Sequence, residues 1–164
     1  MKKIILLFML LLEVQAATAG LQKDQHAKVY NEITVTPSMV EDAHKKAQAE
    51  NKFLMIEFGA NWCSDCMALA RNMEQGQTRN YIRDHFIVLK VDVGQFNRNL
   101  DIAKSLGVDL NKGIPTAVFF APDGKRVGAT NKGELEPSAK YGTQQIYGFL
   151  KEIAERQTIT TPGK

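Results

Sequence analysis

The two cysteines are the residues whose type and spacing indicate chemistry most directly. Cys63 and Cys66 are the only cysteines, and Ser64 and Asp65 stand between them. At a helix start, this spacing places both thiols one turn apart, near enough to form a disulfide. The first thiol faces unpaired N–H groups and the positive end of the helix dipole, which stabilise a thiolate, while the second lies deeper. The pair therefore predicts thiol–disulfide exchange, in which Cys63 attacks and Cys66 resolves the mixed disulfide.

Two other uses of the cysteine pair have weaker support in the sequence. A structural disulfide between residues so close in the chain closes a tiny loop and restricts the unfolded state little. A zinc site needs two more ligands, and His26, His44 and His85 lie at no spacing typical of zinc binding. We therefore expect redox use of the pair and no metal site.

The elements that must position this pair alternate between strands and helices. The apolar run from Phe53 to Phe58 predicts a strand buried on both faces, which leads through a turn into the helix of the cysteines. Gly76 ends that helix, and Thr78 is expected to cap a second, short one. Further strands are expected at 86–93, 116–120 and 125–127, a short edge strand within 29–35, and helices at 37–50, 98–106 and 143–156. This order predicts an α/β layered fold.

The first 19 residues have the pattern of an export signal. Lys2 and Lys3 precede an apolar run from Ile4 to Leu12, and Ala17-Thr18-Ala19 is a small-residue cleavage site. A membrane anchor is the alternative, but nine apolar residues span only about 14 Å as a helix, roughly half of the hydrocarbon thickness. We therefore expect a signal peptide at 1–19, a bacterial periplasmic location, and one domain at 20–164 with its core at about 37–157.

Composition limits the function classes further. Without Lys2, Lys3 and Glu13, the 21 basic and 18 acidic residues become 19 and 17, a formal charge of +2. A chain so close to neutral cannot neutralise many phosphates, so we expect no nucleic-acid partner. With 44% hydrophobic and 24% charged residues, the chain is typical of a globular protein.

The stretch from 53 to 127 resembles the thioredoxin superfamily. The run Ile-Glu-Phe-Gly-Ala-Asn-Trp-Cys at 56–63 is similar to that family's central strand and the start of its active-site helix. Gly-Ile-Pro-Thr at 113–116 is similar to its cis-proline loop, and an Asp-Gly hairpin follows. Leu-Lys-Val-Asp at 89–92 is similar to periplasmic members, including the C-terminal domain of membrane thiol:disulfide interchange proteins. The resemblance implies a thioredoxin-like fold, a central mixed β-sheet flanked by helices.

The resemblance also implies roles for individual residues. Cys63 matches the attacking cysteine and Cys66 the resolving one. Glu57 matches the buried acid that exchanges a proton with the resolving thiol, and burial is expected to raise its pKa. Lys90 matches a lysine that pairs with this acid. These four residues are the expected catalytic group.

Three further residues are expected to meet the substrate. The Ile114–Pro115 peptide bond is expected to be cis, with the Ile114 backbone pairing with an extended substrate segment beside Cys63. Trp62 is expected to pack beside the disulfide and narrow its exposure. No cofactor is implied beyond the redox-active disulfide of Cys63 and Cys66.

The chain also departs from ordinary thioredoxins. Ser64-Asp65 replaces the Gly-Pro that ordinary thioredoxins have between their cysteines. The loop at 108–112 is longer than the usual link, and we expect it to lie beside the active site and alter which partners fit. The segment at 131–141 has no counterpart in the family pattern.

These observations together favour an exported thiol:disulfide oxidoreductase that reduces protein disulfides. At roughly 7 Å in a water-like dielectric, the charge of Asp65 opposes a Cys63 thiolate by about 0.6 kcal/mol, comparable to the ~0.3–1 kcal/mol that the helix N-terminus contributes. No His or Lys stands between the cysteines to stabilise the thiolate, as a strong oxidant requires. The expected partners are cysteine-containing envelope proteins and an inner-membrane thiol electron donor, and the expected state is a monomer.

Three alternatives remain open from the sequence. An oxidase or isomerase would use the same cysteine pair. A metal-binding module, such as a copper carrier, would use both thiolates as soft ligands. A structural or partner-binding domain would keep the cysteines without using them.

Overall fold

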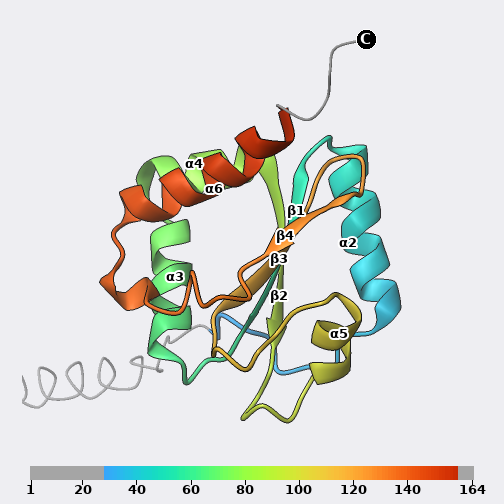
Figure 1. The fold of residues 1–164 in the computed structure, drawn as a ribbon, viewed down its shortest axis with the longest axis vertical. Coiled ribbons are helices and arrows are strands. Elements are labelled where there is room, and N and C mark those ends of the chain that lie inside the picture. Colours follow the sequence, from blue (N-terminus) through green and yellow to red (C-terminus); the bar gives the residue numbers. More distant parts are fainter. Residues whose placement is uncertain (1–27, 159–164) are drawn as a thin grey trace, which may run out of the picture.

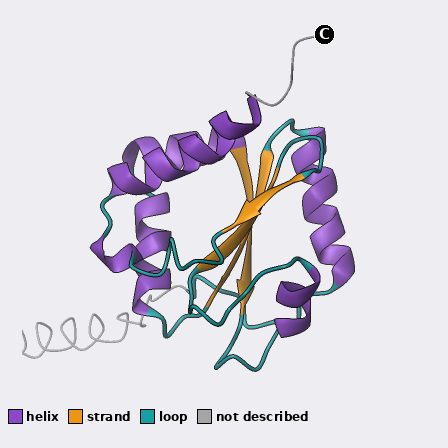
Figure 2. Ribbon diagram, in the orientation of Figure 1, coloured by secondary structure: helices purple, strands orange, loops and turns teal. Residues whose placement is uncertain are grey.

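The computed structural model describes residues 28–158, which form a mixed β-sheet between two layers of helices (Figure 1, Figure 2). The expected signal peptide at 1–19 lies outside these residues. The elements are α2 (Pro37–Ala49), β1 (Phe53–Gly59), α3 (Ser64–Met73), α4 (Gly76–His85), β2 (Phe86–Asp92), α5 (Leu100–Ser105), β3 (Thr116–Phe120), β4 (Arg126–Ala129), a 3₁₀ turn η1 (Ser138–Lys140) and α6 (Thr143–Thr158). Within the described part of the chain, no helix is long and apolar enough to cross a membrane.

The four strands lie in the order β2-β1-β3-β4. β1 pairs with β2 in parallel and with β3 antiparallel, and β3 pairs antiparallel with β4. The Asp123-Gly124 turn joins the last two strands, and Gly124 has a φ of +83°, a conformation that glycine adopts readily. The mixed sheet expected from the resemblance is therefore confirmed, with β1 at its centre.

Both faces of β1 are buried, as the continuous apolar run predicts. Ile56 and Phe58 belong to a core layer that includes side chains of α2 and α5. Met55 points the other way, into a layer that includes side chains of α3 and α6. Figure 1 shows α3, α4 and α6 on one side of the sheet and α2 and α5 on the other. The strand that leads into the cysteine helix is thus held by packing on both faces.

Two local expectations are wrong. The stretch within 29–35 forms no strand, because its backbone groups bond to asparagine side chains instead of a neighbouring strand. Thr78 does not cap the second short helix, which begins at Gly76 after Gln75. The Thr78 hydroxyl donates instead to the Thr143 carbonyl at 3.0 Å and joins α4 to the start of α6.

Candidate active site

Cys63 and Cys66 are joined by a disulfide at the start of α3. Cys63 is the N-cap residue of the helix, and its sulfur accepts a hydrogen bond from the backbone N–H of Cys66 at 3.1 Å. Cys63 keeps 6% of its surface exposed and Cys66 keeps none. The first sulfur is therefore the accessible one, and an N–H group of the helix start is available to stabilise its thiolate.

The proline loop lies directly against this disulfide. The carbonyl oxygen of Ile114 is 3.5 Å from Cys63 Sγ. The Ile114–Pro115 peptide bond is cis, which confirms the expectation for this loop. The Thr116 hydroxyl donates to the Gly113 carbonyl at 2.8 Å and holds the loop at the start of β3. Residues about fifty positions apart in the sequence thus meet at the first cysteine.

Glu57 is a fully buried acid on the central strand. Its side chain has no exposed surface, and its oxygen Oε1 accepts a hydrogen bond from the Tyr30 hydroxyl. The other oxygen, Oε2, has no hydrogen-bond partner among the described residues. Burial raises the pKa of Glu57, while the charge of Lys90 and the Tyr30 hydrogen bond act to lower it. The carboxyl group is therefore suited to hold a proton at a higher pH than an exposed glutamate does.

Lys90 lies directly opposite Glu57 in the parallel register of β1 and β2. No ion pair joins these two side chains of the described chain. The Lys90 ammonium instead lies over the Tyr30 ring, 5.7 Å from its centre. Lys90 thus acts on Glu57 through its charge and not through a direct contact.

Trp62 lies at the surface and not in the core. Its side chain is 51% exposed, and its indole N–H donates to the Gly94 carbonyl at 2.7 Å. The ring centre is 6.1 Å from that of Phe96, which is 41% exposed. Leu100, at the start of α5, is also exposed. Trp62, the residue before Cys63, and Phe96 thus form an exposed aromatic pair.

The three departures from ordinary thioredoxins are joined by hydrogen bonds through the segment at 131–141. Asn131 begins the segment at 131–141, and its side chain accepts from the Asp109 N–H and donates to the Gly107 carbonyl, both at 3.0 Å. Further along this segment, the N–H of Ala139 donates to the Asp65 carboxylate at 2.7 Å. Asp65 is therefore engaged in fixing the added segment to the cysteine helix.

For three residues around the site, the sequence predicted no role in it. Tyr30 and Asn99 lie in or next to aperiodic stretches, and Asn61 is one polar residue in a turn. Asn61 bonds twice to the backbone of Tyr30, and Asn99 bonds to Ile33, Val35 and Asp92. Asn61 lies two residues after β1 and Asn99 lies seven residues after β2, so no common spacing in the sequence marks the two asparagines.

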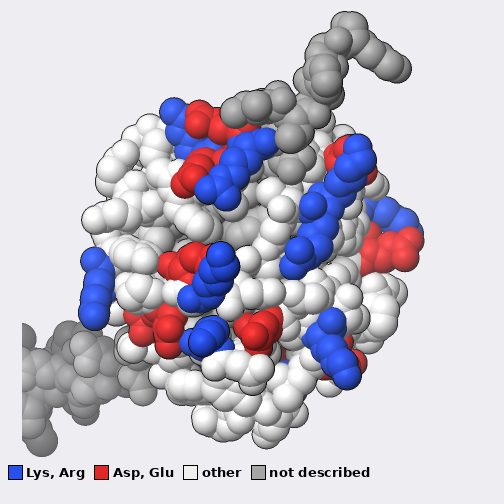
Figure 3. All heavy atoms as spheres, in the orientation of Figure 1, with Lys and Arg blue, Asp and Glu red and all other residues white. Residues whose placement is uncertain are grey.

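One face of the molecule carries mixed charge. Basic and acidic side chains alternate over the face seen in Figure 3, without a large area of one sign. Within residues 28–158, no group of three or more His, Cys, Asp or Glu side chains is arranged to hold a metal ion.

Comparisons with known proteins agree with this arrangement. Residues 35–122 match a family model described as Thioredoxin-like. The structure titled a disulphide isomerase from Xylella fastidiosa Temecula1 has 36% sequence identity and a TM-score of 0.72, covering 76% of this chain and 95% of that chain.

Two curated relatives show how far the likeness extends in sequence. A protein disulfide-isomerase of Triticum aestivum is 32% identical over 122 residues, 73% of this chain and 23% of that protein. A thioredoxin of Mycoplasmoides gallisepticum is 33% identical over 94 residues, 55% of this chain and 84% of that protein. This chain spans about a quarter of the length of the plant disulfide isomerase that it matches.

Proposed function

We propose that this chain, which belongs to the thioredoxin-like family and is a thiol–disulfide oxidoreductase, is a reductase of protein disulfides in the cell envelope. The observation that carries the proposal is the Cys63–Cys66 disulfide at the start of α3. Cys63, beside the Ile114 carbonyl, keeps a small exposed surface, whereas Cys66 keeps none. This asymmetry is what a nucleophile and a resolving thiol require.

The reduction proceeds in two exchanges in which electrons and protons balance. The Cys63 thiolate attacks one sulfur of a substrate disulfide, the substrate S–S bond breaks, and a mixed disulfide forms. Cys66 then loses its proton to the ionised Glu57 and attacks Cys63 Sγ. The substrate leaves as a dithiol with two electrons gained, taking one proton back from Glu57 and the other from water, and the Cys63–Cys66 disulfide has formed. A thiol donor at the inner membrane restores the reduced pair for the next turnover.

Glu57 is the group that we assign to the proton of Cys66. Its complete burial and its unpartnered oxygen support this role, because a carboxyl with a raised pKa can accept and return a proton near neutral pH. Lys90 moderates that pKa through its charge. By accepting the proton of Cys66, Glu57 would promote the attack of Cys66 on the mixed disulfide and so the release of the reduced substrate.

Substrate contact is assigned to the surface around Cys63. The exposed Trp62 ring and the backbone of Ile114 and Pro115 would bind an extended segment on either side of the substrate sulfur. Cysteine-containing proteins of the cell envelope are the proposed substrates. The export of the chain rests on the sequence pattern of residues 1–19.

The direction of electron flow rests on the residues between the cysteines. Asp65 lies in the first turn of α3, where its negative charge disfavours a thiolate at Cys63. A strong oxidant needs a strongly stabilised thiolate, and Ser64 and Asp65 provide no cation for this. These features favour the reducing direction.

The experiment that tests the proposal is insulin reduction with dithiothreitol as electron source. Wild type is expected to accelerate precipitation of the insulin B chain, whereas Cys63→Ser is expected to lose that acceleration. Cys66→Ser retains the attacking thiol and is expected to accumulate mixed disulfides visible by non-reducing electrophoresis. Equal rates for wild type and Cys63→Ser would contradict the proposal, and stoichiometric copper in the reduced protein would favour a carrier.

Isomerisation is the second candidate, because the Xylella fastidiosa and Triticum aestivum relatives are named as disulfide isomerases. Reactivation of scrambled ribonuclease without added oxidant separates the two. An isomerase restores ribonuclease activity with Cys63 alone, since it rearranges disulfides without net electron transfer. A reductase needs both cysteines and leaves ribonuclease reduced.

A further inference from the structure

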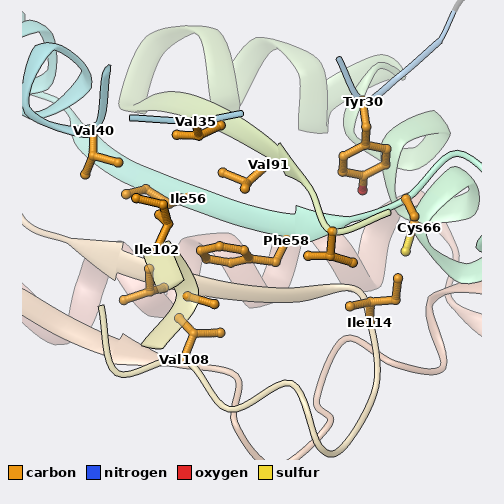
Figure 4. Packing of buried hydrophobic residues seen from close by; sticks show 14 of the residues in the cluster. Tyr30, Val35, Val40, Ile56, Phe58, Cys66, Val91, Ile102, Val108 and Ile114 are labelled. Atoms are coloured by element: carbon orange, nitrogen blue, oxygen red, sulfur yellow. The ribbon is translucent and has the colours of Figure 1, made fainter. Parts of the chain in front are cut away.

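Tyr30 is a buried tyrosine whose placement depends on several parts of the active site. It belongs to residues 28–36, which precede α2 and contain no helix or strand. In Figure 1 this segment, drawn in blue, passes across the lower end of the sheet. Figure 4 shows its side chain reaching toward the end of the sheet at which Cys66 and Ile114 lie. The side chain has no exposed surface.

The backbone of Tyr30 is held by the loop that leads to the first cysteine. The Tyr30 N–H donates to Asn61 Oδ1 at 3.0 Å, and Asn61 Nδ2 donates to the Tyr30 carbonyl at 2.9 Å. Asn61 lies two residues before Cys63, between β1 and α3. The same side chain therefore fixes the position of Tyr30 relative to the cysteine pair.

The ring of Tyr30 is confined on two sides. A Cβ atom at Gly59 would lie 2.7 Å from Tyr30 Cε1 and closer still to Cζ and Oη, so only glycine leaves room for the ring. Lys90 Nζ lies 5.7 Å from the ring centre. With backbone and ring both fixed, the hydroxyl meets Glu57 in one geometry, donating to Oε1.

We propose that Tyr30 is a positioning residue of the active site: its hydroxyl binds one oxygen of Glu57 and leaves Oε2 as the oxygen that exchanges a proton with Cys66. The inference rests on the proposed role of Glu57 as the proton acceptor. It accounts for the buried oxygen that has no partner among the described residues, and for the two bonds and one glycine that hold Tyr30.

The effect of Tyr30 on the pKa of Glu57 adds to that of the charges around Glu57. Lys90 on β2 lowers the pKa of Glu57, and the Tyr30 bond lowers it as well, against the increase from burial. Asp92, at the end of β2, is ion-paired with Arg98.

Two neighbouring elements complete the surroundings of Glu57. On β3, the residue opposite Glu57 is Ala117, which does not titrate. On α3, the cysteine pair is uncharged in the disulfide, and Asp65 in the first turn is engaged with the Ala139 N–H. Removing the Tyr30 hydroxyl therefore takes away one of the two influences that lower the pKa of Glu57, and this pKa is expected to rise.

The test is the pH dependence of mixed-disulfide resolution in Tyr30→Phe. This change keeps the ring that fills the space above Gly59 and removes only the hydroxyl. A hydrogen bond to a charged group corresponds to about one to two pH units, so the midpoint is expected to move up by that amount while the rate at high pH stays unchanged. Tyr147→Phe, on α6 and away from the site, is the matched control and is expected to leave the midpoint in place.

A second variant and a direct titration make the outcome decisive. Asn61→Ala releases the Tyr30 backbone, keeps the hydroxyl, and is expected to move the midpoint in the same direction by less. Carbon-13 NMR titration of the Glu57 carboxyl in the reduced protein, with Glu57→Gln to assign the signal, is expected to show the same shift without any substrate.

An unchanged Glu57 titration in Tyr30→Phe would overturn the inference, even where the protein is active. If Glu57→Gln itself leaves the resolution profile unchanged, the proposed role of Glu57 fails instead. In the double variant with Glu57→Gln, Tyr30→Phe is expected to have no further effect on the profile. An additive effect there would show that Tyr30 acts independently of Glu57 and would overturn the inference.

Discussion

At Glu57, burial and hydrogen bonding act on one carboxyl group in opposite directions. Burial is the largest influence and raises its pKa, while Lys90 and Tyr30 oppose it. A carboxyl whose pKa is higher in the folded than in the unfolded chain costs stability as the pH rises from the lower value to the higher. The reason is that the unfolded chain releases the proton first. The group that serves the proposed proton transfer is therefore also a source of instability at neutral pH.

Glu57→Gln is accordingly expected to become more stable relative to wild type as the pH rises above about 4.5, the ordinary value for glutamate. Urea unfolding of the oxidised proteins at pH 4 and pH 8 measures the difference. Glu74→Gln, at an exposed position, is the control for the substitution itself. A constant offset between Glu57→Gln and wild type would contradict the raised pKa.

At the scale of elements, the strand–helix unit of β1 and α3 was predictable because its signals are local. The apolar run from Phe53, the glycine-containing turn and the cysteine spacing each lie within one short window of sequence. The Asp-Gly turn after β3 is a local signal of the same kind. The resemblance added the cis bond before Pro115 and a mixed sheet with the strand from Phe53 at its centre.

The contacts of residues 28–36 were not predictable, because they join distant parts of the chain through single side chains. Tyr30 bonds to Asn61, 31 residues away, and Val35 bonds to Asn99, 64 residues away. The residue types at 29–30 and 33–35 suggested a short edge strand, but asparagine side chains bond to backbone groups that a strand would pair. The hydrophobic periodicity and the strand propensity of a segment carry no information about such hydrogen-bonded pairs.

The close approach of Tyr30 to β1 gives a test at this scale. Gly59→Ala is expected to destabilise the protein by about 1–3 kcal/mol, because the new methyl group displaces the Tyr30 ring and its bond to Glu57. Gly128→Ala on β4 is the matched control: its Cβ meets no atom within 4 Å, and no loss of stability is expected. Thermal unfolding of both variants decides the matter, and equal melting temperatures would contradict the packing described.

At the scale of the whole molecule, residues 28–36 are held by hydrogen bonds at both ends of their path across the sheet. Asn61 holds Tyr30, and Asn99 accepts from the Val35 N–H at 2.8 Å and donates to the Ile33 carbonyl at 3.0 Å. Asn99 also donates to the Asp92 carbonyl, at 2.8 Å, at the end of β2. The segment therefore links the loops after both parallel strands.

Asn99→Gly is expected to lower the free energy of unfolding by about 2–4 kcal/mol, since three hydrogen bonds are lost. Glycine tolerates the φ of +56° at this position, so the loss reports the side chain and not backbone strain. Asn51→Gly is the matched control, because Asn51 has a similar φ of +52° at an exposed position. Equal effects of the two changes in urea unfolding would contradict the role of Asn99.

The central claim, a reductase built on one cysteine pair, is tested most directly by the redox equilibrium of Cys63 and Cys66 with glutathione. The fraction of reduced protein at pH 7 is measured by thiol labelling across a series of buffers of known potential. With Asp65 beside the pair and no cation between the cysteines, the account predicts a potential from about −230 mV to about −270 mV, in the range of glutaredoxins and thioredoxin. A potential near the ~−120 mV of strong oxidants would contradict it.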